Sequence, residues 1–138
     1  MIAAYPYLNF DGTCEEAFGF YKSVFGGEYE MLMRMGDMPG PHLAPGEENL
    51  IMHMALPIGS SMLMGSDRPK SFGPGKDGNL FYVAIIGDDE VSAGEQFKAL
   101  SAGGKVNMPF EKAPWGDFYG DFTDKFGVQW MFNVGQPR

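Results

Sequence analysis

The chain has 138 residues, 44% of them hydrophobic, which is enough for one compact domain. Its 18 acidic and 10 basic side chains give a net charge of −8, which argues against a nucleic-acid partner because no basic stripe is present to displace counterions from phosphates. We expect neither a secretory leader nor a membrane span, because the sequence shows no charged-then-apolar start and no uninterrupted apolar run near 18 residues. The single cysteine, Cys14, agrees with a reducing compartment, so we expect a cytoplasmic protein without a membrane partner.

The first predicted element is a strand over residues 3–10. Its residues alternate between two faces, with Leu8 and Phe10 on one face and Tyr7 and Asn9 on the other.

A helix is predicted next, from the turn at residues 11–13 to about Phe25. Apolar residues recur there at spacings of three and four, Thr13 offers cap chemistry, and Gly26 ends the helix. Strands are then predicted over about 28–35, 50–56 and 60–65. The Pro/Gly-rich loop 36–48 lies between the first two of these strands, and we expect its polar residues His42, Asp37, Glu47 and Glu48 to face solvent.

The second half repeats this order after a linker over residues 68–78, which is rich in proline and glycine. It predicts a strand at about 79–86, a helix at 89–102, and strands near 105–110, 117–123 and 128–134.

The two halves align with each other. Phe20 and the Gly26-Gly27 step lie over Phe97 and the Gly103-Gly104 step. We therefore predict an α+β fold in a single domain, built from two βαβββ modules of about 1–67 and 79–138 that form a curved-sheet cleft. A cleft between two modules is a common place for a small ligand.

Four segments carry a resemblance to a known family. They are Asn9-Phe10-x-Gly12-x-Cys14-Glu15-Glu16-Ala17 leading to Phe20-Tyr21, Ile51-Met52-His53-Met54-Ala55, Met64-Gly65-Ser66-Asp67, and Thr123-Asp124-Lys125-Phe126-Gly127-Val128-x-Trp130-Met131-x-Asn133. Together they resemble the PhnB-like branch of the glyoxalase/bleomycin-resistance (vicinal oxygen chelate) superfamily, over nearly the whole chain. The resemblance implies paired βαβββ modules and, in many members, a divalent metal that chelates two neighbouring substrate oxygens and acts as a Lewis acid.

The resemblance also implies where metal ligands would lie. Carried over to this sequence, the positions on the first and last strand of each module fall at about Tyr5, Leu63, Tyr82 and Met131. None of these side chains supplies a carboxylate or an imidazole. We therefore expect no cofactor and no metal site of the usual kind, with a divalent metal as the alternative.

His53 is the principal polar candidate in the expected cleft. It is either a hydrogen-bonded structural group or a ligand contact, and its counterpart in the repeat is Asp121, so a pair between the two is conceivable. If Trp130 and Phe132 pack on the helix, the amides of the last strand face the cleft. The candidate ligand-binding residues are Tyr7, Asn9, His53, Trp115, Tyr119, Gln129 and Asn133.

Methionines recur at every second position of several predicted strands. The sets that would share a face are Met31, Met33 and Met35, then Met52 and Met54, then Met62 and Met64. Such repetition indicates either core packing or an adaptable ligand surface.

Two functions are compatible with these observations. The first is binding of a small molecule in the cleft between the modules without the usual metal site. The alternative is a lyase, isomerase or dioxygenase of the superfamily with a non-standard site around His53. We further expect a homodimer, because two half-barrel modules leave sheet edges that need cover.

Overall fold

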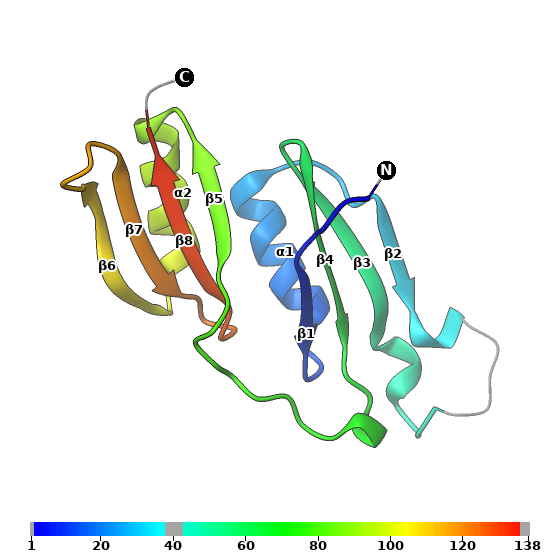
Figure 1. The fold of residues 1–138 in the computed structure, drawn as a ribbon. Helices are drawn as coiled ribbons and strands as arrows, with labels where there is room; N and C mark the ends of the chain where they lie inside the picture. The colour runs from blue at the N-terminus through cyan, green and yellow to red at the C-terminus, as the bar shows by residue number, and fades with distance from the viewer. Residues whose placement is uncertain (1, 38–42, 136–138) are drawn as a thin grey trace. The chain divides into compact units, whose positions relative to one another are not determined.

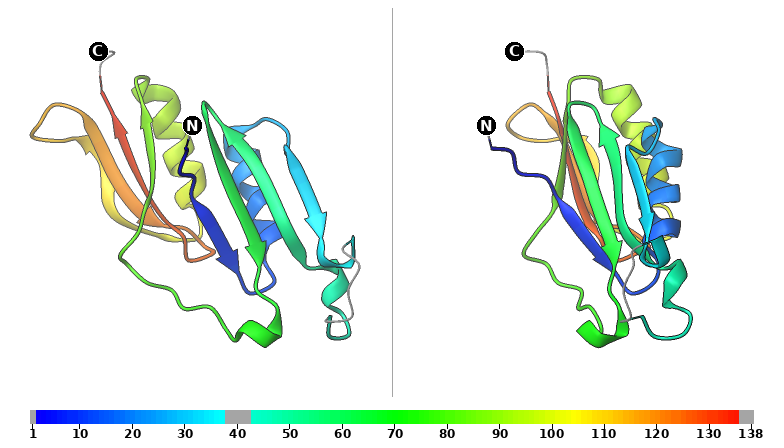
Figure 2. Two further views of the ribbon diagram at one scale, coloured as in Figure 1. Left: turned by 45° about the vertical axis from the view of Figure 1, so that its right-hand side comes forward. Right: turned by 90° about the vertical axis from the view of Figure 1, so that its right-hand side faces the viewer.

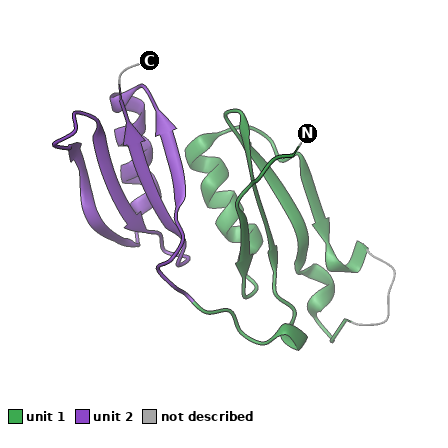
Figure 3. Cartoon of the chain, viewed as in Figure 1, with its two compact units in different colours: residues 1–76 green, residues 77–138 purple. Residues whose placement is uncertain are grey.

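A computed structural model describes residues 2–37 and 43–135 of the chain. It divides the chain into two compact units, residues 1–76 and 77–138, with the boundary inside the predicted linker (Figure 3). Each unit has one four-stranded mixed sheet and one α-helix among its described residues (Figure 1). The predicted α+β class is therefore confirmed. His42 lies outside the described residues.

The first unit follows the predicted βαβββ order. Its elements are β1 (Tyr7–Phe10), α1 (Cys14–Phe25), β2 (Met31–Arg34), β3 (Ile51–Ile58) and β4 (Ser61–Asp67), with short 3-10 turns at Met35–Asp37, Glu47–Asn49 and Lys70–Phe72. The sheet order is β1-β4-β3-β2; β1 runs parallel to β4, and the other neighbours are antiparallel.

The second unit repeats the arrangement. Its elements are β5 (Val83–Gly87), α2 (Glu90–Ser101), β6 (Lys105–Lys112), β7 (Phe118–Thr123) and β8 (Gln129–Val134). The sheet order is β5-β8-β7-β6, again with the first strand parallel to the last.

One face of each sheet is covered by the helix of the same unit (Figure 2). In the first unit, Phe18 of α1 packs so closely on β4 that a Cβ at Gly65 would lie 2.7 Å from the Phe18 ring. In the second unit, Phe97 of α2 makes edge contacts with Phe122 and Phe132, both fully buried. The opposite face of each sheet, here called its open face, has no helix of its own unit over it.

The start of α1 is capped differently from the prediction. The Thr13 side chain makes no cap hydrogen bond. Instead Asp67, at the end of β4, accepts hydrogen bonds from the backbone N–H groups of Gly12 and Cys14 at 3.1 and 2.9 Å, and its other oxygen accepts from Ile51 N–H at 2.8 Å. This buried carboxylate ties the starts of α1 and β3 to the last strand of the unit.

The first strand of each unit is shorter than predicted. β1 begins at Tyr7, because Pro6 has no N–H to donate and contributes only its carbonyl, which accepts from Met64 N–H. β5 begins at Val83, opposite Trp130 of β8, and the earlier Phe81 carbonyl bonds instead to the Gln129 side chain.

Glu47 corrects one prediction about the loop after β2. It is buried, whereas Asp37 and Glu48 are exposed as expected. Its two carboxylate oxygens accept from Ala44 N–H at 3.0 Å and Lys70 N–H at 2.9 Å, and these bonds lower its pKa. Glu47 therefore holds the loop to the segment after β4.

None of the helices in the described part of the chain is both long and apolar enough to cross a membrane.

Candidate functional site

The open face of the first sheet carries a row of aligned side chains from all four strands. In one row the register places Tyr7 of β1 beside Met64, then Ala55, then Met31 of β2. The next row holds His53 of β3 beside Met33 of β2. The faces can be told apart because Met54, Leu56 and Leu63 are fully or almost fully buried on the helix side.

Tyr7 and His53 are joined on this open face. The Tyr7 hydroxyl lies 3.1 Å from His53 Nδ1, and the two rings stack with centroids 5.6 Å apart. Tyr7 is 43% exposed and His53 is partly exposed. Asn9 is exposed one pleat further along β1, opposite Ser66. Three of the predicted ligand residues therefore share this face.

The methionines of the first unit divide between its two faces. Met31, Met33, Met62 and Met64 lie on the open face, partly or largely exposed, whereas Met54 is fully buried beneath the helix. Met35 belongs to a 3-10 turn rather than to β2, so it does not continue the strand face. Met52 does not share a face with Met54, because the register shifts in the β2–β3 pair. The prediction that Met35 shares a face with Met31 and Met33 was therefore wrong, and so was the prediction that Met52 shares a face with Met54.

The open face of the second sheet is lined by the amides of β8. Trp130 and Phe132 are fully buried on the helix side, and Gln129 and Asn133 lie on the opposite face, partly exposed, as the sequence predicted. Asn133 donates to Asp117 Oδ2 at 3.0 Å and accepts from Trp115 Nε1 at 3.3 Å. The polar network therefore fixes the orientation of the Asn133 amide.

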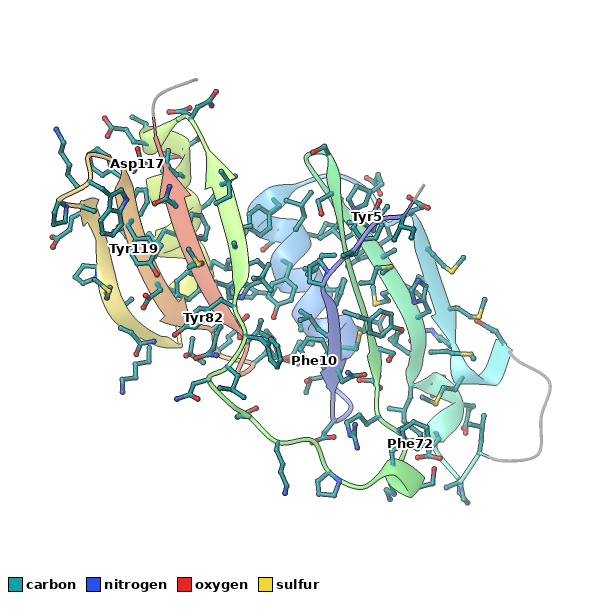
Figure 4. All side chains as sticks on the ribbon, in the orientation of Figure 1. Tyr5, Phe10, Phe72, Tyr82, Asp117 and Tyr119 are labelled. Atoms are coloured by element: carbon teal, nitrogen blue, oxygen red, sulfur yellow. The ribbon has the colours of Figure 1, made fainter. Side chains whose placement is uncertain are left out.

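Tyr119 links this network to the centre of the second sheet. Its ring meets Trp115 edge-on at 5.7 Å, and its hydroxyl donates to Asp121 Oδ2 at 2.9 Å. Partial burial and the Asp121 carboxylate raise the pKa of Tyr119 to about 12. Tyr119 is therefore a neutral donor at physiological pH. Figure 4 labels Asp117 and Tyr119 on this unit.

A groove of about 480 Å³ lies elsewhere in the first unit, beside the turn after β1 and the segment after β4. None of the predicted ligand residues lines it. Two of its charged side chains are engaged by nearby backbone groups: Arg68 donates to the carbonyls of Phe72 and Gly73, and Glu47 accepts from the two N–H groups described above. We therefore do not assign the groove to a ligand.

The family model of the Glyoxalase/Bleomycin resistance protein/Dioxygenase superfamily matches residues 7–132. The chain belongs to this superfamily. Protein YjdN of Escherichia coli strain K12 is 32% identical over 139 aligned positions, which cover 94% of this chain and 92% of YjdN.

Solved structures of similar proteins agree with this glyoxalase-like fold. Protein PA1353 of Pseudomonas aeruginosa is 36% identical, with a TM-score of 0.88 over 99% of this chain and 100% of that one. The Bacillus cereus PhnB protein, described as a putative 3-demethylubiquinone-9 3-methyltransferase, has a TM-score of 0.76 and 23% identity over 97% of this chain and 100% of that one. At that identity, the likeness to the PhnB protein shows the fold alone.

The residues at the superfamily's expected metal positions do not fit a divalent metal. Leu63, one of the predicted positions, is buried on the helix side, and its open-face neighbour beside Tyr7 is Met64. Tyr5 precedes β1 and Tyr82 precedes β5. Thioether and phenol side chains are poor ligands for a hard cation. In residues 2–37 and 43–135, no three His, Cys, Asp or Glu side chains are grouped to hold an ion.

The structure brings the site residues together in two sets. Tyr7, Asn9 and His53 share the first unit, and Trp115, Tyr119, Gln129 and Asn133 share the second. The conceivable pair of His53 with Asp121 would join residues of two different units, and it stays a prediction. Within each unit, the partner is instead a tyrosine: Tyr7 for His53 and Tyr119 for Asp121.

Sequence reasoning left Asp117 out of the ligand set, although it anchors Asn133. The signal was present in the segment 114–120, where a carboxylate lies between two aromatic residues.

Proposed function

We propose that this glyoxalase-superfamily protein binds a small organic molecule against the open faces of its sheets without the superfamily's usual divalent metal. The observation that carries the proposal is that each open face presents aromatic and polar side chains whose orientations are already fixed. Pre-organised groups of this kind lower the entropy cost of binding.

The first unit supports a ligand with a flat or apolar part. The stacked Tyr7 and His53 rings offer an aromatic edge, and Met31 and Met64 lie in the row beside them. Methionine side chains are polarisable and adapt to the shape of an apolar ligand.

The second unit supports a ligand that also carries polar groups. Trp115 is 60% exposed, so its ring is available for stacking while its N–H stays bonded to Asn133. The phenol of Tyr119 and the amide of Asn133 lie on the same open face, at opposite positions of β7 and β8. Both groups can hydrogen-bond a polar ligand.

A thermal-shift screen of small aromatic and polar metabolites, run beside metal analysis of the purified protein, tests this function. A ligand at one hundred times its Kd is expected to stabilise the native state by about 2.7 kcal/mol. Trp115→Ala and Tyr7→Phe are expected to reduce the stabilisation, and Val91→Ala, at an exposed apolar position of α2, is the matched control. Stoichiometric zinc, iron, nickel or manganese that survives dialysis and is required for binding would overturn the metal-free proposal.

The second candidate function is a lyase, isomerase or dioxygenase with a site around His53. The observation in its favour is the Tyr7 hydroxyl at 3.1 Å from His53 Nδ1, which orients the ring as the partner of a general base commonly does. If this function holds, His53→Gln will abolish turnover of a ligand found in the screen while leaving its binding largely intact.

We also propose a homodimer. It is supported by the edge position of β5 in its sheet and by the exposure of Leu80, Phe81 and Ile86 in and before that strand. Light scattering at micromolar concentration is expected to give twice the mass of one chain, and Ile86→Lys is expected to shift it toward one chain. The mass of a single chain for the unaltered protein would contradict the dimer.

A further inference from the structure

Two methionines of β2 lie next to His53 on the open face of the first sheet. Met33 is directly opposite His53 in the antiparallel β2–β3 pair, and Met31 is opposite Ala55, so it lies diagonal to His53 on the same face. Directly opposite residues have Cβ atoms about 5 Å apart, and diagonal ones about 7–8 Å, both within reach of long side chains. Figure 4 shows sulfur atoms, in yellow, around β2 and β3.

The hydrogen bond of His53 leaves its other ring nitrogen available. Nδ1 is engaged by the Tyr7 hydroxyl at 3.1 Å, and in the tautomer where Nδ1–H donates to that oxygen, Nε2 carries a lone pair. Metal-ligating histidines are commonly held in this way, with the second nitrogen donating to an oxygen that fixes the ring.

The chemistry of this donor set selects a soft cation. Thioether sulfurs bind Cu(I) well and hard divalent ions poorly, whereas imidazole binds both. No acidic side chain alternates with these methionines on β2, whose residues are Met31, Leu32, Met33 and Arg34.

We propose that β2 and β3 carry a binding site for a soft monovalent cation, Cu(I), formed by His53 Nε2 and the thioether sulfurs of Met31 and Met33. The cation binds without a change of its oxidation state, and Tyr7 acts as the positioning residue for the imidazole. The inference does not rest on the small-molecule function, since it is tested with the ion alone.

Titration with Ag(I), a redox-inert substitute for Cu(I), provides the first test. In protein labelled with ¹³C at the methionine methyl groups, saturation at one ion per chain is expected to shift the Met31 and Met33 signals and leave that of Met108, an exposed methionine of the second unit, in place. Anaerobic Cu(I) competition with a chromogenic chelator then gives the affinity.

Variants locate the site. The double variant Met31→Leu/Met33→Leu keeps the size and apolarity of the side chains and is expected to weaken Cu(I) binding more than about tenfold, as is Tyr7→Phe. Met62→Leu on the same face and Met108→Leu in the other unit are the matched controls and are expected to bind as the unaltered protein does. Equal thermal unfolding of the variants without metal shows that they fold.

Three results would overturn the site. They are the absence of saturable binding, unchanged affinity in the double variant, and loss of binding on Cys14→Ala with no loss in the methionine variants. The last result would assign the ion to the thiol, although Cys14 is fully buried at the start of α1.

Discussion

The Tyr7 hydroxyl lies 3.1 Å from Nδ1 of His53, across the strand that separates β1 from β3. The second unit has a related pair at the position that aligns with His53, where Tyr119 donates to Asp121 at 2.9 Å. Each module thus uses a tyrosine hydroxyl to fix a titratable side chain on its open face. The two pairs differ in chemistry, since one partner is an imidazole and the other a carboxylate.

Tyr7→Phe is expected to change the tautomer of His53. In the unaltered protein the hydrogen bond between the Tyr7 hydroxyl and Nδ1 favours one tautomer of the His53 imidazole. Because Tyr7→Phe removes this bond, we expect a mixture of the two tautomers in the variant. Long-range ¹H–¹⁵N spectra of the imidazole distinguish these states. Tyr119→Phe, in the other unit, is the control and is expected to leave the His53 signals unchanged. Identical imidazole spectra in Tyr7→Phe and the unaltered protein would show that the hydrogen bond has no influence.

Gly65→Ala is expected to destabilise the protein by about 1–3 kcal/mol, because the new methyl group would overpack the core. A Cβ there would lie 2.7 Å from Phe18 Cε1 and 3.0 Å from the Leu8 carbonyl oxygen. Gly19→Ala is the matched control on α1. A Cβ at Gly19 would have no other atom within 4 Å, and the alanine is expected to stabilise the helix by up to about 1 kcal/mol because of its higher helix propensity. Urea unfolding measures both changes, and equal effects of the two substitutions would contradict the close packing of α1 on β4.

Tyr119 is expected to ionise near pH 12, later than an ordinary tyrosine, because burial and then the bond to Asp121 raise its pKa to about 12. A pKa raised in the folded state means that the folded protein holds the proton more tightly. The stabilisation is therefore complete below about pH 10, the ordinary tyrosine value, and is lost as the pH rises toward 12.

Spectra of ¹³Cζ-labelled tyrosine follow this titration, and Tyr119→Phe assigns the signal. Asp121→Asn is expected to lower the Tyr119 pKa because it removes the carboxylate charge. A Tyr119 signal that titrates near pH 10 in the unaltered protein would be inconsistent with the hydrogen bond.

Asp124→Asn is expected to destabilise the protein by about 2–4 kcal/mol, since a buried charged acceptor would be replaced by an amide whose N–H₂ faces other donors. Asp124 is buried; its Oδ1 accepts from the N–H groups of Phe126 and Val128 and its Oδ2 from Trp130 Nε1 at 2.9 Å. Asp88→Asn, at an exposed position before α2, is the control and is expected to change little. Chemical denaturation gives the free energy of unfolding of both variants. A decrease of less than about 0.5 kcal/mol in that free energy for Asp124→Asn would contradict a structural role of Asp124.

Local pattern was sufficient to predict the order of elements and the facing of β8. The repeated Gly-Gly steps marked the ends of both helices, and alternation alone placed Trp130 and Phe132 opposite Gln129 and Asn133. Pattern failed where a long-range partner decides the structure. The cap of α1 comes from Asp67, more than fifty positions along the chain, and no local spacing reveals it.

The sequence predicted several residues of the candidate site but not the side chains to which they are hydrogen-bonded. His53 was identified, yet its bond to Tyr7 depends on β1 lying parallel to β4, which the two predicted strand ranges do not specify. The segment 123–133 was useful for recognising the family, and the structure shows that its Asp124 accepts hydrogen bonds from the β7–β8 turn and from Trp130. This aspartate therefore has a structural role.

Chemical-shift mapping tests the proposed binding function most directly. A compound that stabilises the protein in the thermal-shift screen is added to isotope-labelled protein, and the shifts of backbone, indole and methionine methyl signals are followed to saturation. We expect saturable shifts at open-face residues, above all Tyr7, His53, Trp115 and Asn133, with the exposed surfaces of α1 and α2 unaffected. Shifts confined to the helices or to the groove beside Arg68, with the open faces unchanged, would contradict the proposal.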